Sequence, residues 1–251
     1  MRSPWNEQAV LIDAEYASLF APALPPETRL RCRHEGDPAS AVAALLAMVR
    51  QRRPRWRNRL HVWLGYPWAQ GQLLPWQPGM PGGDSHWRGY AQALLRERGM
   101  VGEWRVRLGA ARHGRARLAV AADANLLDRL QRAVSESGWA MAGCRDLLSA
   151  SLERYRRPLR QLGKCLVLAE AGAMTCVWQS PEGWDDMITL QLAPGQPPTS
   201  GVAAAEALCG RPIAAGYGWA STLSPQQSPA PPQARWLGFP HPMLGGQSCS
   251  G

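Results

Sequence analysis

The chain has 251 residues, with 28 Lys plus Arg against 19 Asp plus Glu and a formal net charge of +9. This length suits one large domain or two small ones, and a hydrophobic content of 45% excludes a globally disordered chain. The sequence has no run of about 18 apolar residues, and residues 1–10 lack the apolar segment of a secretion signal. We therefore expect a cytoplasmic protein without a membrane span.

Positive charge is concentrated in the first part of the chain. Residues 1–160 carry 25 basic and 14 acidic side chains, whereas residues 161–251 carry 3 and 5. The six cysteines form no Cys-x-x-Cys or Cys-x-x-His pair, so zinc spacing is absent and no metal is expected. In a reducing compartment these cysteines are expected to be small buried hydrophobic residues.

Residues 1–65 predict three strands, a helix and a fourth strand. Asp37-Pro38 marks the helix start, because Asp caps free N–H groups and Pro suits the first turn. The following segment is apolar almost all round, which is typical of a buried helix. The expected elements are strands at 10–13, 17–21 and 28–33, the helix at 39–49, and a strand at 60–64.

Residues 66–158 form a predicted inserted α+β block that completes the first lobe. Asp84 or Ser85 caps an amphipathic helix that Gly99 closes, and Asp123 caps a second one. The remaining elements are strands at 72–76, 104–108, 115–121 and 139–143, and a short helix at 147–156 that Pro158 ends.

Residues 159–220 repeat the first order of elements without a detectable sequence repeat. The expected strands are 165–169, 174–178, 187–192 and 213–217, with a helix at 201–208 before the last one. The pattern indicates a duplicated topology.

Residues 221–251 contain six Pro, four Gly and five Ser and show no apolar periodicity. We expect a disordered tail that is dispensable for folding. Its segment Trp236-Leu-Gly-Phe239 is either a short docking motif or an accidental aromatic pair.

Two arginine clusters are candidate partner-binding sites. Residues 50–59 hold six arginines, among which Arg55 and Arg57 flank Trp56. In the hairpin, strand alternation places four arginines on the exposed face: Arg105, Arg107, Arg115 and Arg117. Such a face binds phosphate or an acidic protein surface, or is simply a solvated strand face that discourages edge pairing.

Signatures of catalysis are absent from the sequence. It contains no phosphate-binding GxxxxGK[ST] loop, no GxGxxG and no GxSxG, and its five histidines are scattered. No catalytic residue is nominated on these grounds.

The segment LHVWLGYPWAQGQLLPW (60–76), followed by WRVRL (104–108) and RLAVAAD (117–123), resembles actin-like proteins of type IV pilus and type II secretion assembly. PilM, the GspL cytoplasmic domain and MshI represent this group, and the resemblance covers about residues 8–215. It implies an α/β fold with an actin-like duplicated βββαβ core, the inserted block and the tail.

Active members of this fold hold metal and phosphates with two Asp-x-Gly turns. The resemblance places Asp13-Ala14-Glu15 and Glu170-Ala171-Gly172 at these turns. Glu15 replaces the glycine whose backbone approaches phosphate, and its carboxylate would repel phosphate charge. Asp13, Glu15, Glu170 and Gly172 are therefore vestigial nucleotide-site candidates. Gly216 and Gly218 are weak candidates for an adenosine-binding segment.

The resemblance implies a cytoplasmic scaffold, recruited to the inner-membrane face, with a degenerate nucleotide site and no required cofactor. It would dock an assembly ATPase or the cytoplasmic segment of an inner-membrane component. One alternative is an active actin-like ATPase or small-molecule kinase that binds ATP and magnesium. A further alternative is an arginine-rich nucleic-acid-binding module.

Overall fold

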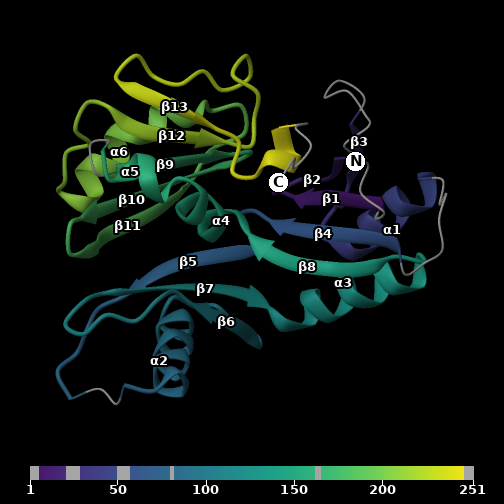
Figure 1. The fold of residues 1–251 in the computed structure, drawn as a ribbon, viewed down its shortest axis with the longest axis horizontal. Coiled ribbons are helices and arrows are strands. Elements are labelled where there is room, and N and C mark those ends of the chain that lie inside the picture. The colour runs from purple at the N-terminus through teal and green to yellow at the C-terminus, as the bar shows by residue number, and fades with distance from the viewer. Residues whose placement is uncertain (1–5, 21–28, 50–56, 80–81, 162–164, 246–251) are drawn as a thin grey trace.

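The computed structural model describes residues 6–20, 29–49, 57–79, 82–161 and 165–245, whose strands form three sheets (Figure 1). The first sheet has the order β3-β2-β1-β4-β8, the second β11-β10-β9-β12-β13, and the third β5-β7-β6. Each five-stranded sheet belongs mainly to one half of the duplicated core, and the third sheet lies within the inserted block. The predicted α/β class and the duplication are confirmed.

The first half follows the predicted order of three strands, a helix and a strand. Its elements are β1 (Asn6–Ile12), β2 (Tyr16–Phe20), β3 (Leu30–Arg33), α1 (Pro38–Met48) and β4 (Asn58–Leu64). The β1–β2–β3 meander is antiparallel, and β4 runs parallel to β1. Asp37 caps α1 as expected, because its side chain accepts a hydrogen bond from the Ser40 N–H.

The inserted block adds the third sheet to this half and returns to the first sheet. Its elements are β5 (Ala69–Leu74), α2 (Asp84–Glu97), β6 (Trp104–Leu108), β7 (Arg117–Asp123), α3 (Ala124–Glu136), β8 (Ala140–Asp146), α4 (Leu147–Arg154) and α5 (Arg156–Leu159). Asp123 caps α3 as predicted. The helix predicted at 147–156 is divided at Tyr155, and Pro158 lies inside α5 instead of ending the helix before it.

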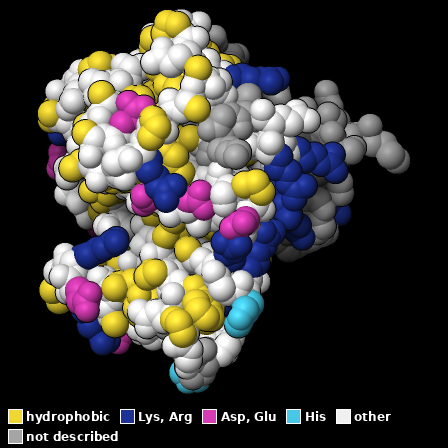
Figure 2. All heavy atoms as spheres, turned by 90° about the vertical axis from the view of Figure 1, so that its left-hand side faces the viewer, with side chains coloured by type: hydrophobic (Ala, Val, Ile, Leu, Met, Phe, Trp, Pro, Cys, Tyr) yellow, Lys and Arg dark blue, Asp and Glu magenta, His cyan; other side chains and the backbone are white. Residues whose placement is uncertain are grey.

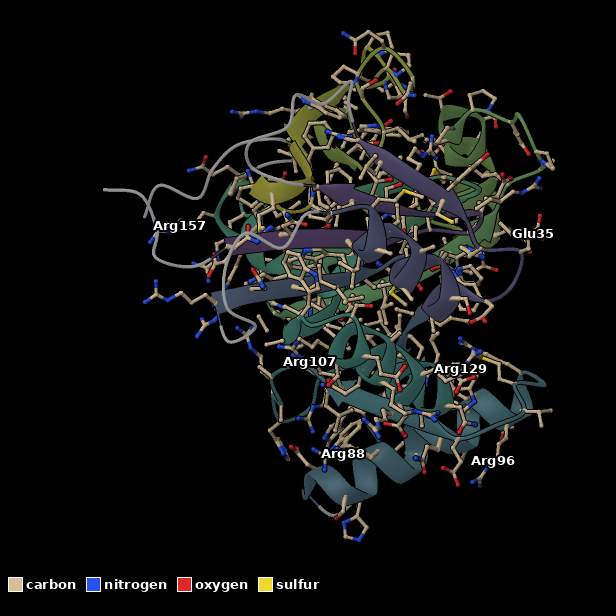
Figure 3. All side chains as sticks on the ribbon, turned by 90° about the vertical axis from the view of Figure 1, so that its right-hand side faces the viewer. Glu35, Arg88, Arg96, Arg107, Arg129 and Arg157 are labelled. Atoms are coloured by element: carbon tan, nitrogen blue, oxygen red, sulfur yellow. The ribbon has the colours of Figure 1, made fainter. Side chains whose placement is uncertain are left out.

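Two helical layers cover the first half and its insertion. α1 and α3 pack together over one face of the first sheet, where Val10, Val62 and Leu130 share a core. Arg129 of α3, labelled in Figure 3, also forms an ion pair with Asp37, at 3.1 Å. α2 covers one face of the third sheet through the buried Trp87.

The second half repeats the order of the first. Its elements are β9 (Cys165–Glu170), β10 (Ala173–Ser180), β11 (Gly183–Gln191), α6 (Gly201–Cys209) and β12 (Tyr217–Ser221). β12 runs parallel to β9, as β4 does to β1. The last strand begins at Tyr217, not at residue 213, because Ile213 lies in a loop where its N–H is bonded to the Glu206 side chain at 2.6 Å.

The prediction of a disordered tail is wrong for residues 221–245, and residues 246–251 lie outside the described residues. Ser221 ends β12, and β13 (Ala234–Gly238) pairs with β12 as a parallel edge strand. The 3₁₀ turn η4 (Pro242–Gly245) then reaches the first half, where Leu244 is only 1% exposed. Composition could not show this, because the partners of the segment are distant in the sequence.

The described residues contain no helix that combines the length and apolarity required to cross a membrane.

Candidate functional site

The two turns at the expected nucleotide position lie close to each other. One joins β1 to β2 at residues 13–15, and the other joins β9 to β10 at Ala171 and Gly172. A Cβ built on Gly172 would lie 3.6 Å from the Ala14 Cβ, an ordinary van der Waals distance. The duplicated topology therefore brings the two turns together, with room for only about a methyl group between Gly172 and Ala14.

Asp13 is engaged by its own turn. Its Oδ1 accepts hydrogen bonds from the N–H groups of Glu15 and Tyr16, at 2.9 and 2.7 Å. Its backbone carbonyl accepts from Trp68 Nε1 at 2.7 Å and contacts His34 Nε2 at 3.0 Å. Glu15 itself is exposed. Asp13 thus stabilises a tight turn, in the manner of an Asx turn.

The Glu170 side chain reaches from the second half into the first. Its Oε1 accepts a hydrogen bond from the Tyr66 N–H at 3.0 Å, and a Cβ on Gly65 would lie 2.5 Å from the same oxygen. A Cβ at position 65 would therefore force this carboxyl group to move. The cavity that remains here is about 20 Å³, about the volume that one water molecule needs.

The pKa of Glu170 is raised to about 7, chiefly by burial and to a smaller extent by the carboxylates of Asp146 and Asp13, against the hydrogen bond from Tyr66. Asp146 was not among the sequence candidates. It ends β8, caps α4 by accepting from the Ser149 N–H, and has its own pKa raised by burial. Its signal in the sequence is the capping pattern Asp146-Leu-Leu-Ser149.

The residues at this position leave little open space. Ala14 and Gly172 are separated by about the width of a methyl group, and the Glu170 carboxyl group occupies the space over Gly65, beside a cavity of about 20 Å³. Within the described ranges, no group of three or more His, Cys, Asp or Glu side chains is arranged to hold a metal ion. Gly218 lies within β12, where a Cβ would be 2.6 Å from the Leu237 side chain, so it packs against β13.

The predicted face of four hairpin arginines is wrong. β6 and β7 pair so that Arg105 lies opposite Ala122 and Arg107 opposite Val120. Directly paired residues have numbers of opposite parity, so odd-numbered arginines on the two strands take opposite faces. Arg105 and Arg107 therefore share their face with Leu118 and Val120, contrary to the alternation expected from the sequence.

Arg117 and Arg115 have other roles. Arg117 is 5% exposed, forms an ion pair with Asp84 at 2.9 Å and lies over the Trp87 ring under α2. Arg115 precedes β7 and forms an ion pair with Glu182, in the β10–β11 turn, at 2.5 Å. Arg55 and Trp56 lie outside the described residues, and Arg57 is half-buried directly before β4.

A cleft of about 810 Å³ opens between the third sheet and the second half. One wall is the sheet face that carries Arg107, the other is formed by α4 and α5, and the β10–β11 turn lies at one end. Its arginines are Arg107, Arg112, Arg115, Arg145, Arg156 and Arg160. Figure 2 shows the hollow between these two parts of the molecule and basic side chains along its margin.

The bottom of this arginine cleft is apolar. Leu118, Val120, Leu152 and Leu159 are buried there, and Trp184 is half-buried beside them. An apolar bottom with charged groups around it is the usual make-up of a binding site.

Some of the cleft arginines are already paired with carboxylates of the chain. Arg145 pairs with Glu153, and Arg115 pairs with Glu182, whose backbone carbonyl also accepts from Arg112 at 3.4 Å. In the part of the chain that the structure describes, no carboxylate lies within ion-pair distance of Arg107, Arg156 or Arg160. The cleft therefore holds an excess of positive charge.

Most of this cleft was not predicted from the sequence. Only Arg107 and Arg115 were candidates, while Arg112, Arg145, Arg156, Arg160 and Trp184 were not. The basic run at 154–160 was visible as a signal. Its position opposite the hairpin arises only from the packing of α4 and α5 between the third sheet and the second half.

No protein-family model matches the chain, and no curated protein sequence is significantly similar to it. Solved structures do resemble it. The cytoplasmic domain of EpsL, an inner-membrane component of the type II secretion system of Vibrio cholerae, aligns with a TM-score of 0.54 at 10% identity, over 95% of this chain and 92% of that domain.

A Bacteroides thetaiotaomicron protein with an actin-like ATPase fold and unknown function also has a TM-score of 0.54, at 7% identity, over 87% of this chain and 82% of that one. The structure of a PilM–PilN type IV pilus biogenesis complex aligns with a TM-score of 0.46 at 12% identity, over 84% of this chain and 68% of that chain. The predicted resemblance in fold is confirmed: this chain has the actin-like ATPase fold.

Proposed function

We propose that the chain is a scaffold of a type IV pilus or type II secretion-like machine and works at the cytoplasmic face of the inner membrane. It docks an assembly ATPase or the cytoplasmic segment of an inner-membrane component. The observation that carries this proposal is the likeness to the EpsL cytoplasmic domain, which extends over nearly the whole length of both chains.

A role without nucleotide turnover is part of the proposal. It is supported by the close approach of the two turns and by the Glu170 carboxyl group over Gly65, which leave little space for phosphates. The arginine cleft provides an open surface for a partner, so docking does not require space between the two turns near Glu170.

Affinity purification of the full chain from its native host, followed by mass spectrometry, tests the docking role. We expect pilus or secretion assembly components to be enriched over a mock purification. Recovery of none of them, with the bait well expressed, contradicts the proposal.

A thermal-shift measurement with ATP and magnesium tests the alternative of an active ATPase or kinase. A ligand at 100 times its dissociation constant adds about 2.7 kcal/mol to the unfolding free energy. We expect no shift with the nucleotide, and a clear shift would restore the enzyme alternative.

A further inference from the structure

We infer that the arginine cleft binds an acidic peptide segment, whose carboxylates pair with the arginines while an apolar side chain of the same segment packs against Trp184 and the leucines below. This inference rests on the proposed function, because it names the chemistry of the docked partner.

Charge complementarity is the first argument. Six arginines line the cleft, and Glu153 is its only acidic lining residue within the described part of the chain. The guanidinium group suits carboxylates, because its planar donors can bind both oxygens of one carboxylate. A surface with this excess of charge attracts acidic partners and repels basic ones.

The pairs inside the chain are the second argument, since they show which anion these arginines hold. Arg115 binds the Glu182 carboxylate and Arg145 binds the Glu153 carboxylate, both at the cleft. Glu182 is 60% exposed and Glu153 is 69% exposed, so both are free to move away when a carboxylate of a partner takes their place. Exposed ion pairs of this kind contribute little to stability, so their exchange costs little.

The apolar bottom is the third argument. Small inorganic anions or a nucleic-acid backbone gain nothing from the buried leucines and valine under the arginines. A peptide that alternates acidic and apolar residues uses both features at once. In extended form its side chains point alternately to opposite sides, toward the arginines and toward the bottom of the cleft.

The inference predicts a gain of affinity when a competing internal carboxylate is removed. Glu182→Gln frees Arg115 for the partner and keeps the size of the side chain. The matched control is Asp128→Asn. Asp128 forms an ion pair with Arg105 at 2.6 Å, and neither residue lines the cleft. Both variants change the net charge of the protein by the same amount.

Fluorescence anisotropy on the full chain measures this with a labelled ten-residue peptide of alternating Glu and Leu. We expect salt-sensitive binding of this peptide and none of its Gln-for-Glu counterpart. Glu182→Gln should tighten binding severalfold and Asp128→Asn should leave it unchanged. The double variant Arg156→Gln/Arg160→Gln should weaken binding about tenfold or more, and a thermal melt verifies that it folds.

Failure to bind the Glu–Leu peptide overturns the inference, and so does an equal effect of Glu182→Gln and Asp128→Asn. The inference is also overturned, in favour of nucleic acid, if a labelled ten-nucleotide single-stranded RNA binds more tightly than the Glu–Leu peptide and if this RNA binding is lost in the Arg156→Gln/Arg160→Gln variant. If the purification recovers assembly components equally well with the double variant, the docking role stands and only the assignment of the cleft fails.

Discussion

The Glu170 position and the arginine cleft both lie where the second half of the chain meets the first half and its insertion. At Glu170 a buried carboxyl group bridges the halves and leaves about 20 Å³, whereas the cleft retains about 810 Å³. The first contains buried acidic groups and the second exposed basic ones. A junction that is closed at one place and open at another holds the two halves of the chain together and still leaves an open basic surface.

Leu244, near the C-terminus, contributes to the closed part of the junction, and its substitution measures how much this part depends on the C-terminal segment. Leu244 belongs to the core that includes Leu11 and Leu166, one from each half. Leu244→Ala should lower the free energy of unfolding by about 3 kcal/mol, because it leaves a cavity in this shared core. Chemical denaturation measures the change.

The matched control is Leu208→Ala on α6, whose side chain is 68% exposed and whose loss should change stability by less than about 0.5 kcal/mol. Equal, small effects of the two substitutions would restore the prediction of a dispensable tail.

Glu170→Gln tests how much the buried, ionised carboxylate of Glu170 lowers the stability of the folded protein. The pKa of Glu170 is raised from 4.5 to about 7, so the folded state keeps a proton that the unfolded state releases between these values. The stability of the wild type therefore decreases as pH rises through this window, by about 3 kcal/mol in total, and the loss is complete above pH 7.

The Gln variant cannot titrate, so its advantage over the wild type should grow from pH 4.5 to pH 8 by about this amount. Urea denaturation at a series of pH values measures it, with the exposed Glu15→Gln as control. A difference that does not vary with pH would show that Glu170 titrates as an ordinary carboxyl group.

Gly65→Ala tests whether the two halves touch as closely as the structure indicates. The new Cβ would lie 2.5 Å from Glu170 Oε1, so the variant should lose about 1–3 kcal/mol of stability. Gly143→Ala in β8 is the matched control, because no heavy atom apart from those of residues 142–144 lies within 4 Å of the position that its new Cβ would take.

Combining Gly65→Ala with Glu170→Ala should recover part of the loss, which a double-mutant cycle measures. Additive effects would mean that the two residues are not in contact.

Asp13→Ala should have the smallest effect, about 1 kcal/mol, because it removes hydrogen bonds within a single turn. A folded Asp13→Ala variant should still recover the same partners in the purification experiment. Complete loss of these partners by a stably folded variant would indicate a functional carboxylate and reopen the ATPase alternative.

The local parts of the fold could be predicted from the sequence. The caps at Asp37 and Asp123 and the order of strands in both halves are carried by neighbouring residues, so pattern and capping rules are sufficient. The meeting of Asp13 with Glu170 required the family resemblance, because nothing local relates turns more than 150 residues apart.

Two failures have physical causes that a single sequence hides. The faces of the hairpin arginines depend on strand register, and a shift by one residue moves a side chain to the other side of the sheet. β13 and η4 are ordered because β13 pairs with the free edge of β12 and η4 packs against the first half. The local Pro and Gly content reveals neither of these contacts.

The return of residues 239–245 to the first half also sets an order of events during synthesis. Arg29 Nη2 donates to the Leu244 carbonyl at 2.9 Å, and these residues are 215 positions apart. Tyr155 donates to the Phe239 carbonyl at 2.5 Å, and Trp63 stacks on His241 with ring centroids 4.4 Å apart. At about 5–20 residues per second, a ribosome needs about 10–40 s to cover that distance. During that interval, the part of the first half that residues 239–245 cover in the folded protein is exposed, and this exposed apolar surface is accessible to chaperones.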